Sequence, residues 1–321
     1  MENVKIYDVI VIGGGPVGLY ATFIAGYLKL NCLCIEADEI LGGQPNKVYP
    51  SKFIYDFPGY EKITGSELTQ ILEKQARQYS QYTSIQTGIK IVSYEIDEEG
   101  TIILIDDKLN HYFTKNVILT VGIGAFEPMK LEQFADSLTC EKVKYCLEPD
   151  HTYDNKKILI LGGGDAAVDY AKHIQEKTNS LSVTLAHRRD KLRADGLTVE
   201  DLQQAGVKVL MPATLTGWTT NSCQFSFPDG SETQIEYDLL LVQYGLKNLG
   251  SNIHSWASFN KLANKFVVDE HFETNIKRFY AAGNCVSRPN RINMIIMGIS
   301  EVNLIINRIR SEIPHEGRVG W

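Results

Sequence analysis

The sequence lacks the features that would place it in a membrane, outside the cell or on a nucleic acid. No apolar run approaches the ~18 residues that a membrane-spanning helix needs, and the first residues do not have the layout of a signal peptide. Lys and Arg total 32 against 39 Asp and Glu, a net charge of −7 that argues against nucleic-acid binding. Six irregularly spaced cysteines in 321 residues do not form a disulfide framework. We therefore expect a cytoplasmic protein with no nucleic-acid or membrane partner.

The sequence also lacks the C-x-x-C pair of a dithiol reductase. Its nearest pair, Cys140 and Cys146, has C-x5-C spacing, and Val143 stands where the other sulfur of a C-x-x-C would be. These cysteines could form a disulfide only if the backbone brought their Cα atoms within about 7 Å, and their spacing is not the one that lowers a thiol pKa. A catalytic disulfide is the disfavoured alternative. The 7 histidines and 6 cysteines show no metal-binding spacing, so we expect no metal site.

What the sequence does have is two glycine loops, each after an apolar strand. Residues 7–12 form the first strand, and the loop GGGPVG follows, then a helix over 19–29 and a second strand ending in Glu36. In such a dinucleotide-binding unit Gly13 makes the tight turn, Gly15 lets a pyrophosphate approach and Gly18 lets the helix pack on the strand. The helix N-terminus favours phosphate, and the acid can accept hydrogen bonds from ribose hydroxyls. A chance match to this whole pattern is the alternative.

The second loop repeats the pattern with one change at the end of its second strand. Strands at 157–161 and 181–186 flank GGGDAA, but the second strand ends in HRRDKLR rather than in an acid. Arginines offer planar, bidentate donors to a ribose 2′-phosphate, which a carboxylate would repel. The loop therefore predicts NADP(H), against the alternative of a solvated basic turn. The expected NADP(H) residues are Gly162, Gly164, Asp165, Ala167, Arg188, Arg189 and Arg193.

The order of these elements predicts an α/β protein with two Rossmann-like domains, the second inserted in the first. A helix over 66–79 capped by Ser66 and a three-stranded meander over 89–113 lie between the two loops. Similar strand-to-glycine stretches at 117–121 and 239–244 bracket the second loop, and the last 75 residues return to the first domain. The predicted domains are 1–115 with 246–321, whose loop suits a nucleotide with a plain adenosine ribose, and 116–245, which would bind NADP(H).

At this point the sequence resembles the two-dinucleotide-binding flavoproteins of the thioredoxin reductase group. Within them it is most similar to the thioredoxin-reductase-type ferredoxin/flavodoxin–NADP+ reductases, and the resemblance covers nearly the whole chain. The resembling stretches are GGGPVGLYA (13–21), LGGQPNKVYPSKFIYDFPGYEKI (41–63), GIGAFEP (122–128), LGGGDAAVDYA (161–171), HRRDKLRA (187–194) and YAAGN (280–284). The second of these is the most specific, because the disulfide-reducing relatives carry a different sequence there.

The resemblance implies FAD in the first site and a role for each matching residue. Gln44 would lie beside the flavin or its phosphates, Tyr49 would stack on the ring, Ile89 would use its backbone near the adenine, Phe126 would lie near the ring, and Asn284 would reach the ribityl chain. Tyr49 as an ordinary exposed aromatic is the alternative. The implied FAD residues are Gly13, Gly15, Pro16, Gly18, Glu36, Gly43, Gln44, Tyr49, Ile89, Phe126 and Asn284.

Three departures from the family pattern concern the surroundings of the flavin. Asn284 replaces the usual Asp, the helix over 293–303 is bulkier and more apolar, and the chain stops at Trp321 where the family lays a ring over the second flavin face. Trp321 is a candidate for that ring, within one chain or across a dimer, and a disordered tail is the alternative. These departures put the electron acceptor in doubt more than FAD or NADPH.

The activity that the resemblance implies is FAD-dependent transfer of electrons from NADPH to a one-electron carrier, ferredoxin or flavodoxin. No catalytic residue beyond the flavin is required. Residues 277–321 hold seven Lys and Arg against three Glu, a local surplus that would steer an acidic carrier unless it is ordinary charge variation. Alternatives are an NADPH-dependent flavin or quinone reductase, a thioredoxin-reductase-like enzyme without C-x-x-C, and a non-catalytic redox sensor. A homodimer is implied by the resemblance alone.

Overall fold

The chain forms two compact units, one of which interrupts the other. The computed structural model describes residues 5–50, 52–194, 198–250, 253 and 256–313, so Trp321 lies outside the described residues. The first unit joins Met1–Ala125 to Asn248–Trp321, and the second is Phe126–Lys247. The predicted class, α/β with one Rossmann-like domain inserted in another, is confirmed. Two strands at the crossings, β11 (Ala125–Pro128) and β20 (Leu246–Gly250), pair with each other.

The first unit is built on a five-stranded parallel sheet of order β23-β10-β2-β3-β6. Its strands are β2 (Val9–Ile12), β3 (Cys32–Ile35), β6 (Thr83–Gln86), β10 (Val117–Leu119) and β23 (Phe279–Ala281). Its helices are α1 (Pro16–Tyr27), α2 (Gly43–Lys47), α3 (Gly65–Ala76), η1 (Arg77–Tyr79), η5 (Gly283–Cys285) and α6 (Ile295–Glu312). Smaller strands are β1 (Ile6–Tyr7), β4 (Phe53–Ile54), β5 (Ile63–Thr64), β7 (Ile91–Ile96), β8 (Ile102–Asp106), β9 (His111–Thr114), β21 (Lys261–Leu262), β22 (Lys265–Val267) and β24 (Val286–Ser287).

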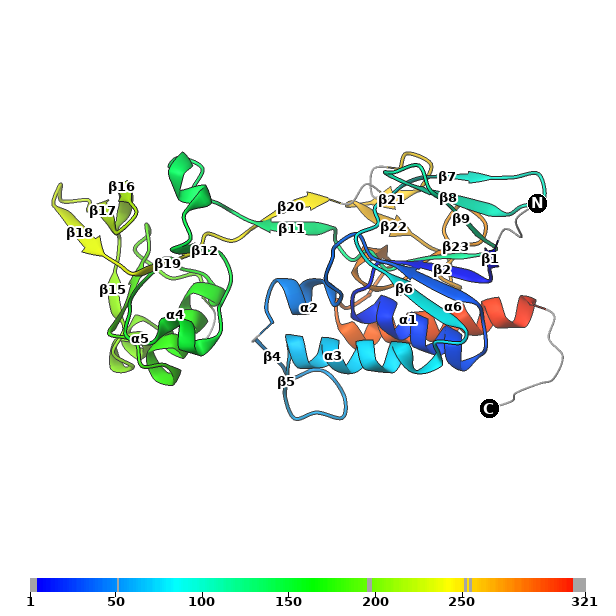
Figure 1. Cartoon of the computed structure of the whole chain (residues 1–321), viewed down its shortest axis with the longest axis horizontal. Helices are drawn as coiled ribbons and strands as arrows, with labels where there is room; N and C mark the ends of the chain where they lie inside the picture. The colour runs from blue at the N-terminus through cyan, green and yellow to red at the C-terminus, as the bar shows by residue number, and fades with distance from the viewer. Residues whose placement is uncertain (1–4, 51, 195–197, 251–252, 254–255, 314–321) are drawn as a thin grey trace. The chain divides into compact units, whose positions relative to one another are not determined.

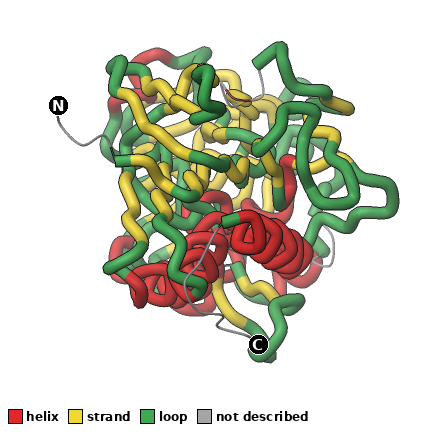
Figure 2. The backbone as a smooth tube through the Cα atoms, turned by 90° about the vertical axis from the view of Figure 1, so that its right-hand side faces the viewer, coloured by secondary structure: helices red, strands yellow, loops and turns green. Residues whose placement is uncertain are grey.

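This sheet is covered on both faces, which is why its strands are continuously apolar. Val9 and Val11 of β2 point into a core shared with α1 and α6, whereas Ile10 and Ile12 point into a core shared with β7 and β8. Figure 1 shows α1, α3 and α6 along one side of the sheet and the β7-β8-β9 meander on the other. The side view of Figure 2 shows helices gathered below strands. The predicted meander is confirmed.

A buried carboxylate holds the turn between β8 and β9. Burial by itself would raise the pKa of Asp106, but four hydrogen bonds, from the backbone and side chain of Asn110, the backbone of Lys108 and the hydroxyl of Tyr112, lower it overall. Burial, followed by that hydrogen bond, raises the pKa of Tyr112 to about 12. The four donors favour the ionised form of the Asp106 carboxylate, and this carboxylate in turn fixes the conformation of the turn.

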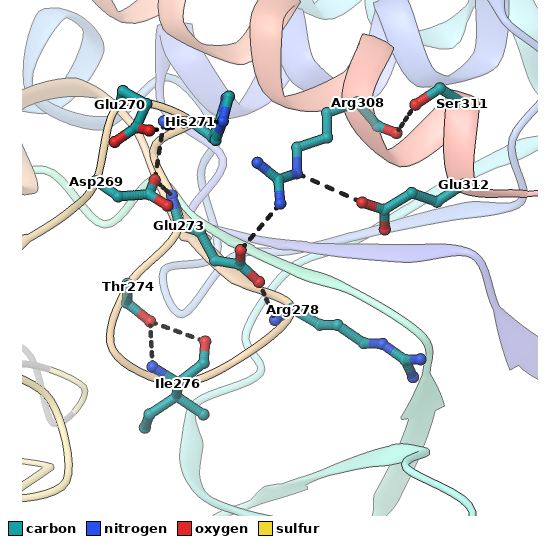
Figure 3. A network of polar contacts seen from close by, with 10 residues as sticks. All are labelled: Asp269, Glu270, His271, Glu273, Thr274, Ile276, Arg278, Arg308, Ser311 and Glu312. Carbon is teal, nitrogen blue, oxygen red and sulfur yellow. Dashed lines mark hydrogen bonds and ion pairs between the residues drawn. The ribbon is translucent and has the colours of Figure 1, made fainter.

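A second polar network ties α6 to the loop that precedes β23 (Figure 3). Arg308 of α6 lies 3.3 Å from Glu273 and 3.4 Å from Glu312. The Glu273 carboxylate also accepts a hydrogen bond of 2.7 Å from the backbone N–H of Arg278, and the loop is turned by Asp269, which accepts from the backbone of Glu273. The network anchors the C-terminal half of α6 to this loop, and it does not include the first turn of the helix.

The second unit repeats the plan of the first. Its parallel sheet has the order β12-β19-β13-β14-β15, in which β13, β14 and β19 take the places of β2, β3 and β10. Its sheet strands are β12 (Val143–Lys144), β13 (Lys157–Gly162), β14 (Ser182–Ala186), β15 (Lys208–Leu210) and β19 (Leu239–Gln243). The other elements are α4 (Asp165–Lys177), α5 (Val199–Gln204), η2 (Ala135–Thr139), η3 (Asp150–Tyr153) and the antiparallel strands β16 (Thr214–Thr219), β17 (Ser222–Ser226) and β18 (Glu232–Glu236).

The two faces of this second sheet are again covered differently. Ile158 and Ile160 of β13 pack with α4 and α5, while Leu159 and Leu161 pack with residues of β17. Both units therefore have a parallel sheet with helices on one face and three antiparallel strands on the other. The two glycine loops indicate an internal duplication, and the structure shows that it includes the sheet and the layers on both of its faces.

Two predicted boundaries shift in the structure. The start of the inserted segment moves from residue 116 to Phe126, because β10 pairs with β2 and β23 of the first sheet. Its end moves from residue 245 to Lys247. The predicted helix cap at Ser66 is wrong. Thr64 caps α3, accepting from the Glu67 N–H while the Glu67 carboxylate accepts from the Thr64 N–H. A capping box needs an acid three residues after the cap, and Ser66 is followed there by Thr69.

The described residues contain neither a membrane-spanning helix nor a cluster of metal ligands. No described helix combines the length and the apolarity needed to cross a membrane. In the same part of the chain no group of three or more His, Cys, Asp and Glu side chains is placed to hold a metal ion.

Candidate functional site

The first glycine loop is shaped by contacts that leave no room for side chains. Gly13 has φ +110°, and a Cβ there would lie 2.6 Å from the carbonyl oxygen of Thr120. A Cβ on Gly18 would lie only 1.8 Å from the carbonyl oxygen of Gly13. Gly18 thus lets the backbone of α1 rest directly on the loop. These two predicted residues are required by the protein's own packing.

Gly15 differs, because its missing side chain faces open space. The nearest atom to a Cβ on Gly15 is the Cα of Gly43, at 3.9 Å. Gly43 has φ +54°, and the N–H of Gly42 donates to the carbonyl of Gly14 over 2.8 Å. No side chain caps α1, and Pro16 at its start has no N–H to satisfy. Gly14, Gly15, Gly42 and Gly43 therefore form a backbone cradle at a helix N-terminus, a place suited to a phosphate group.

Glu36 lies at the end of β3, beside this cradle. Its Oε2 accepts a hydrogen bond of 2.5 Å from the Gly14 N–H, and its Oε1 accepts one of 2.9 Å from the Asp38 N–H. Burial raises the pKa of Glu36 above its usual range, and these two donors act in the opposite direction. Each carboxylate oxygen can accept a further hydrogen bond. The acid is thus held against the loop with acceptor capacity for ribose hydroxyls.

The remaining predicted FAD residues, except Phe126, lie in the first unit around the same loop or after it. Gln44 lies in α2 directly after the cradle, and Tyr49, two residues beyond that helix, is half-buried, with a pKa raised by burial. The Ile89 N–H already donates to the carbonyl of Glu36, so its carbonyl is the group left to meet a ligand. Asn284 lies in η5 after β23 and is half-buried. Phe126 begins the second unit in β11, and its side chain lies outside what the structure describes.

The second glycine loop follows the same rules with looser helix packing. A Cβ on Gly162 would lie 2.4 Å from the carbonyl oxygen of Gln243 and 2.9 Å from the Cβ of Ala167. Ala167 stands where the first loop has Gly18, so here a methyl group fits between helix and loop. Nothing lies within 4 Å of a Cβ on Gly164, which begins α4 without a side-chain cap. Gly164 thus borders open space as Gly15 does.

The arginine segment folds back onto this second loop. The Arg193 N–H donates to the carbonyl of Gly163 over 2.6 Å. His187 is buried, its Nε2 lies 3.1 Å from the carbonyl of Lys191, and a Cβ on Gly163 would lie 2.4 Å from its ring. Burial lowers the pKa of His187, and the nearby arginines lower it further. His187 was not among the predicted site residues; its signal is a histidine at the end of a buried strand, directly before the arginines.

The charged groups of the second site remain at the surface. Arg188, Arg189 and Arg193 are exposed, and within the described ranges none of the three forms an ion pair with an acid. Asp165 is also exposed, at the first residue of α4. The segment after β14 thus presents three cations beside the second glycine loop, and no carboxylate directly follows that strand. This arrangement is suited to a 2′-phosphate.

Thr120 is a second site residue that the sequence prediction did not include. Its hydroxyl is within hydrogen-bond distance of the carbonyls of Ile12 and Gly13, at 3.0 and 2.8 Å, and its own carbonyl bounds the Gly13 turn. It directly follows β10, which is adjacent to β2 in the sheet but more than a hundred residues away in the chain. A threonine at the end of a buried strand is the only sequence signal for it.

The two cysteines of the C-x5-C segment pack with different layers of the second unit. Cys140 packs in the cluster on the β17 face of the sheet. Cys146 is exposed and near Tyr170 of α4, a residue of the opposite cluster; burial raises the pKa of Tyr170 to about 12, with Cys146 as a smaller cause. All six cysteines are among the described residues, and none is in a disulfide. The structure therefore gives no support to a catalytic dithiol.

The basic surplus of residues 277–321 is partly used inside the first unit. Arg291 pairs with Glu301, Arg308 pairs with Glu273, and Arg288 lies over the ring of Phe272, 4.7 Å from its centroid. These contacts engage three of the seven basic side chains that the sequence counts there. The argument from local charge to an acidic carrier is correspondingly weaker than the sequence indicates.

Comparison with known proteins identifies relatives over nearly the whole chain. The family described as "Pyridine nucleotide-disulphide oxidoreductase" matches residues 7–299. A "Ferredoxin--NADP reductase" of Halalkalibacterium halodurans is 34% identical over 323 residues, covering 98% of this chain and 96% of the relative. A "Ferredoxin--NADP reductase 2" of Bacillus subtilis is 34% identical over 324 residues, covering 99% and 96%.

Solved structures agree on the fold. The thioredoxin reductase of Lactococcus lactis matches with a TM-score of 0.68 at 24% identity, covering 96% of this chain and all of that one. The thioredoxin reductase of T. acidophilum matches with a TM-score of 0.71 at 20% identity, covering 96% and 99%. The family match and the sequence relatives establish that the chain belongs to the pyridine nucleotide-disulphide oxidoreductase family and, within it, to the group of ferredoxin–NADP reductases.

Proposed function

We propose that the chain is an FAD-dependent oxidoreductase that takes electrons from NADPH and passes them through the flavin to a one-electron carrier, ferredoxin or flavodoxin. The observation that carries this proposal is the pair of equivalent glycine loops with different residues at the end of the second strand. The first loop has Glu36, and the second has Arg188 and Arg189. A carboxylate suits a plain adenosine ribose, and guanidinium groups suit a ribose 2′-phosphate.

The residues of the first unit fit FAD in two respects: the glycines leave space for its phosphates, and backbone N–H groups are available as hydrogen-bond donors. The cradle of glycines would be filled by any Cβ on Gly15 or Gly43, and the N–H groups at the start of α1 have no side-chain cap. Gly13, Gly15 and Gly43 would hold the pyrophosphate, Glu36 would hold the adenosine ribose, and Gln44, Tyr49, Ile89, Phe126 and Asn284 would line the rest. When bound, FAD accepts a hydride from NADPH and returns electrons singly, which no side chain can do.

The chain's own part in the reaction is to bind and orient two nucleotides. In the first unit the pyrophosphate charge would be met by backbone N–H groups and the N-terminus of α1. In the second unit Gly162, Gly164 and Ala167 would admit the NADPH pyrophosphate, and Asp165 would lie at the start of the same helix. Arg188, Arg189 and Arg193 would bind the 2′-phosphate. We assign no general acid or base, because hydride transfer between two nucleotides needs none.

One set of assays tests the proposal and separates it from its rivals. The purified protein should carry yellow flavin, and NADPH should bleach it without oxygen faster than NADH does. The reduced protein should then be offered ferredoxin, flavodoxin, thioredoxin and a quinone in turn. Reduction of ferredoxin or flavodoxin supports the proposal. Reduction of the quinone alone would make the protein a quinone reductase, and bound flavin that NADPH does not bleach would make it a sensor.

A thioredoxin reductase is the rival with the same fold, and the cysteines argue against it. Relatives that are 34% identical over nearly the whole chain are named for ferredoxin, not thioredoxin. Val143 occupies the place of one dithiol sulfur, and Cys140 and Cys146 pack with different layers. Turnover with thioredoxin at a rate above that with ferredoxin would contradict this assignment.

We further propose that the protein works in the cytoplasm as a homodimer. Six cysteines without a disulfide are in keeping with a reducing compartment. The dimer rests on the family resemblance, and light scattering of the purified protein would test it: a mass near twice the 36.0 kDa of one chain is expected, and a mass near one chain would exclude it.

A further inference from the structure

A charged pair is buried between η5 and α6, away from the surface. The side chains of Arg291 and Glu301 are 5% and 4% exposed. Nε of Arg291 lies 2.7 Å from Oε1 of Glu301, and Nη2 lies 3.3 Å from Oε2. Long charged side chains are rarely this buried, and a buried ion pair often stabilises a fold no more than apolar residues of the same volume would. Packing alone therefore does not account for this pair.

The pair also holds two stretches of backbone. Oε2 of Glu301 accepts a hydrogen bond of 2.7 Å from the N–H of Gly283, the first residue of η5. The Nη1 group of Arg291 donates to the carbonyl of Ile292 and to the side chain of Asn293, over 3.3 and 3.1 Å. One salt bridge thus connects the η5 turn, the segment that leads into α6, and α6 itself.

The held turn lies against the helix that begins at the cradle. A Cβ on Gly298 of α6 would lie 2.5 Å from the side chain of Val17 and 3.0 Å from the Cα of Gly283. Gly283 has φ +79°, and a Cβ on it would lie 3.3 Å from Val17. The η5 turn, α6 and the first turn of α1 therefore meet through glycine backbones. The position of Asn284 relative to Gly15 is set at this junction.

We propose that Glu301 and Arg291 are positioning residues of the flavin site, which keep the Gly283–Asn284 turn in the conformation that binds FAD. The Glu301 carboxylate performs this task by accepting the hydrogen bond from the Gly283 N–H, and Arg291 neutralises and orients that carboxylate. The inference rests on the proposed function, because it takes the cradle as the place of FAD. Neither residue was among the predicted site residues, although an acid on the apolar face of a helix is a signal in the sequence.

Two double variants separate positioning from stability. Arg291→Met/Glu301→Leu removes both buried charges and leaves the Gly283 N–H without its acceptor. Arg291→Met/Glu301→Gln removes the same charges but keeps an amide oxygen for that N–H. We expect the leucine variant to bind FAD at least about tenfold more weakly, because only a fraction of molecules holds the competent turn. The glutamine variant should stay within about threefold of the wild type. The measurement is titration of flavin-free protein with FAD, followed by flavin fluorescence.

A matched control lies on the same helix. Arg308→Met breaks the ion pair with Glu273 and should lower the stability of the first unit without changing FAD affinity. If the leucine variant does not fold, Glu301→Gln alone serves instead. The amide of Gln has one oxygen, so either its NH2 group faces the Nε–H donor of Arg291 or it faces the Gly283 N–H. FAD affinity should therefore fall, and adding Arg291→Met should restore it.

Three results would overturn the inference alone: wild-type FAD affinity in the leucine variant, equal losses in the leucine and glutamine variants, or an equal loss in Arg308→Met. In the fallback, an unaltered affinity of Glu301→Gln, or no recovery on adding Arg291→Met, would do so too. A wild-type protein that binds no FAD would overturn the proposed function and this inference with it. The two failures are therefore distinguishable in one series of titrations.

Discussion

Replacing Gly15 and Gly18 by Ala in turn should separate loss of cofactor from loss of fold. The two glycines are three residues apart in the same loop, but the structure surrounds them differently. A methyl on Gly15 would have only ordinary contact, 3.9 Å from Gly43 Cα, whereas a methyl on Gly18 would lie 1.8 Å from Gly13 O. Gly15→Ala should therefore fold and lose FAD, and Gly18→Ala should lose both stability and FAD.

The distances give the size of the two effects. Gly15 has φ −73°, which Ala adopts without strain, so the loss of about 0.5–1 kcal/mol expected for Ala at an N-cap is offset by a similar gain in unfolded-state entropy. Gly18→Ala forces α1 back by roughly 1.5 Å, and overpacking of this kind costs about 1–3 kcal/mol, less about 0.5–1 kcal/mol of helix propensity. The net cost of about 0.5–2 kcal/mol should lower the melting temperature by roughly 1–8 °C.

The assay is thermal unfolding of the flavin-free proteins by circular dichroism, with FAD affinity measured separately. Flavin-free protein is needed because a bound cofactor raises the melting temperature by mass action. Gly164→Ala provides the control in the second unit: it should fold, keep FAD and bind NADPH more weakly, because nothing lies within 4 Å of its Cβ. Normal FAD affinity in Gly15→Ala, or equal melting of flavin-free Gly15→Ala and Gly18→Ala, would refute the reasoning.

Three further predictions concern the second site, the cysteines and the meander. Arg188→Ala/Arg189→Ala should raise KM for NADPH roughly 10- to 100-fold and leave KM for NADH nearly unchanged in steady-state assays. Cys140→Ser/Cys146→Ser should reduce the carrier at the wild-type rate; loss of that activity would show a dithiol step. Because hydrogen bonds lower the pKa of Asp106 in the folded state, its carboxylate stabilises the fold above about pH 4, and this contribution is lost as the pH falls through the folded pKa. Asp106→Asn should therefore lower the unfolding free energy by about 1–3 kcal/mol at pH 7, with the difference disappearing toward acid pH in denaturant titrations.

The sequence predicts the parts of this fold that follow from local pattern. Apolar runs ending in glycine locate β2 and β13, and the acid or the arginines that follow the next strand distinguish the two loops. Gly13 and Gly18 were predicted for reasons that the contacts bear out: a tight turn and a close helix. These features depend on neighbours within a few dozen residues, which a linear pattern records.

What the sequence does not predict depends on contacts between distant segments. Thr120 shapes the Gly13 turn from a strand that is adjacent only in the sheet, and the pairing of Glu301 with Gly283 requires α6 to return across η5. The same cause explains the shifted boundary at residue 116, since β10 belongs to the first sheet only through its pairing with β2 and β23. The cap at Thr64 is a different case, because the capping box T-x-x-E is a local pattern that the sequence contains. The prediction of a cap at Ser66 does not take it into account.

The discontinuity of the first unit has a consequence for the order in which the protein folds during synthesis. The second unit is continuous, so it can fold as soon as Lys247 has left the ribosome. The first unit must wait for β23 and α6. Until then the edge of β10 is open, and the core under α1 lacks the residues that β23 and α6 contribute. An open strand edge is prone to pair with other chains. Ribosome-bound chains from which Lys247 has emerged but β23 has not should therefore contain a protease-resistant second unit and a first unit that depends on chaperones, although the first unit begins the chain.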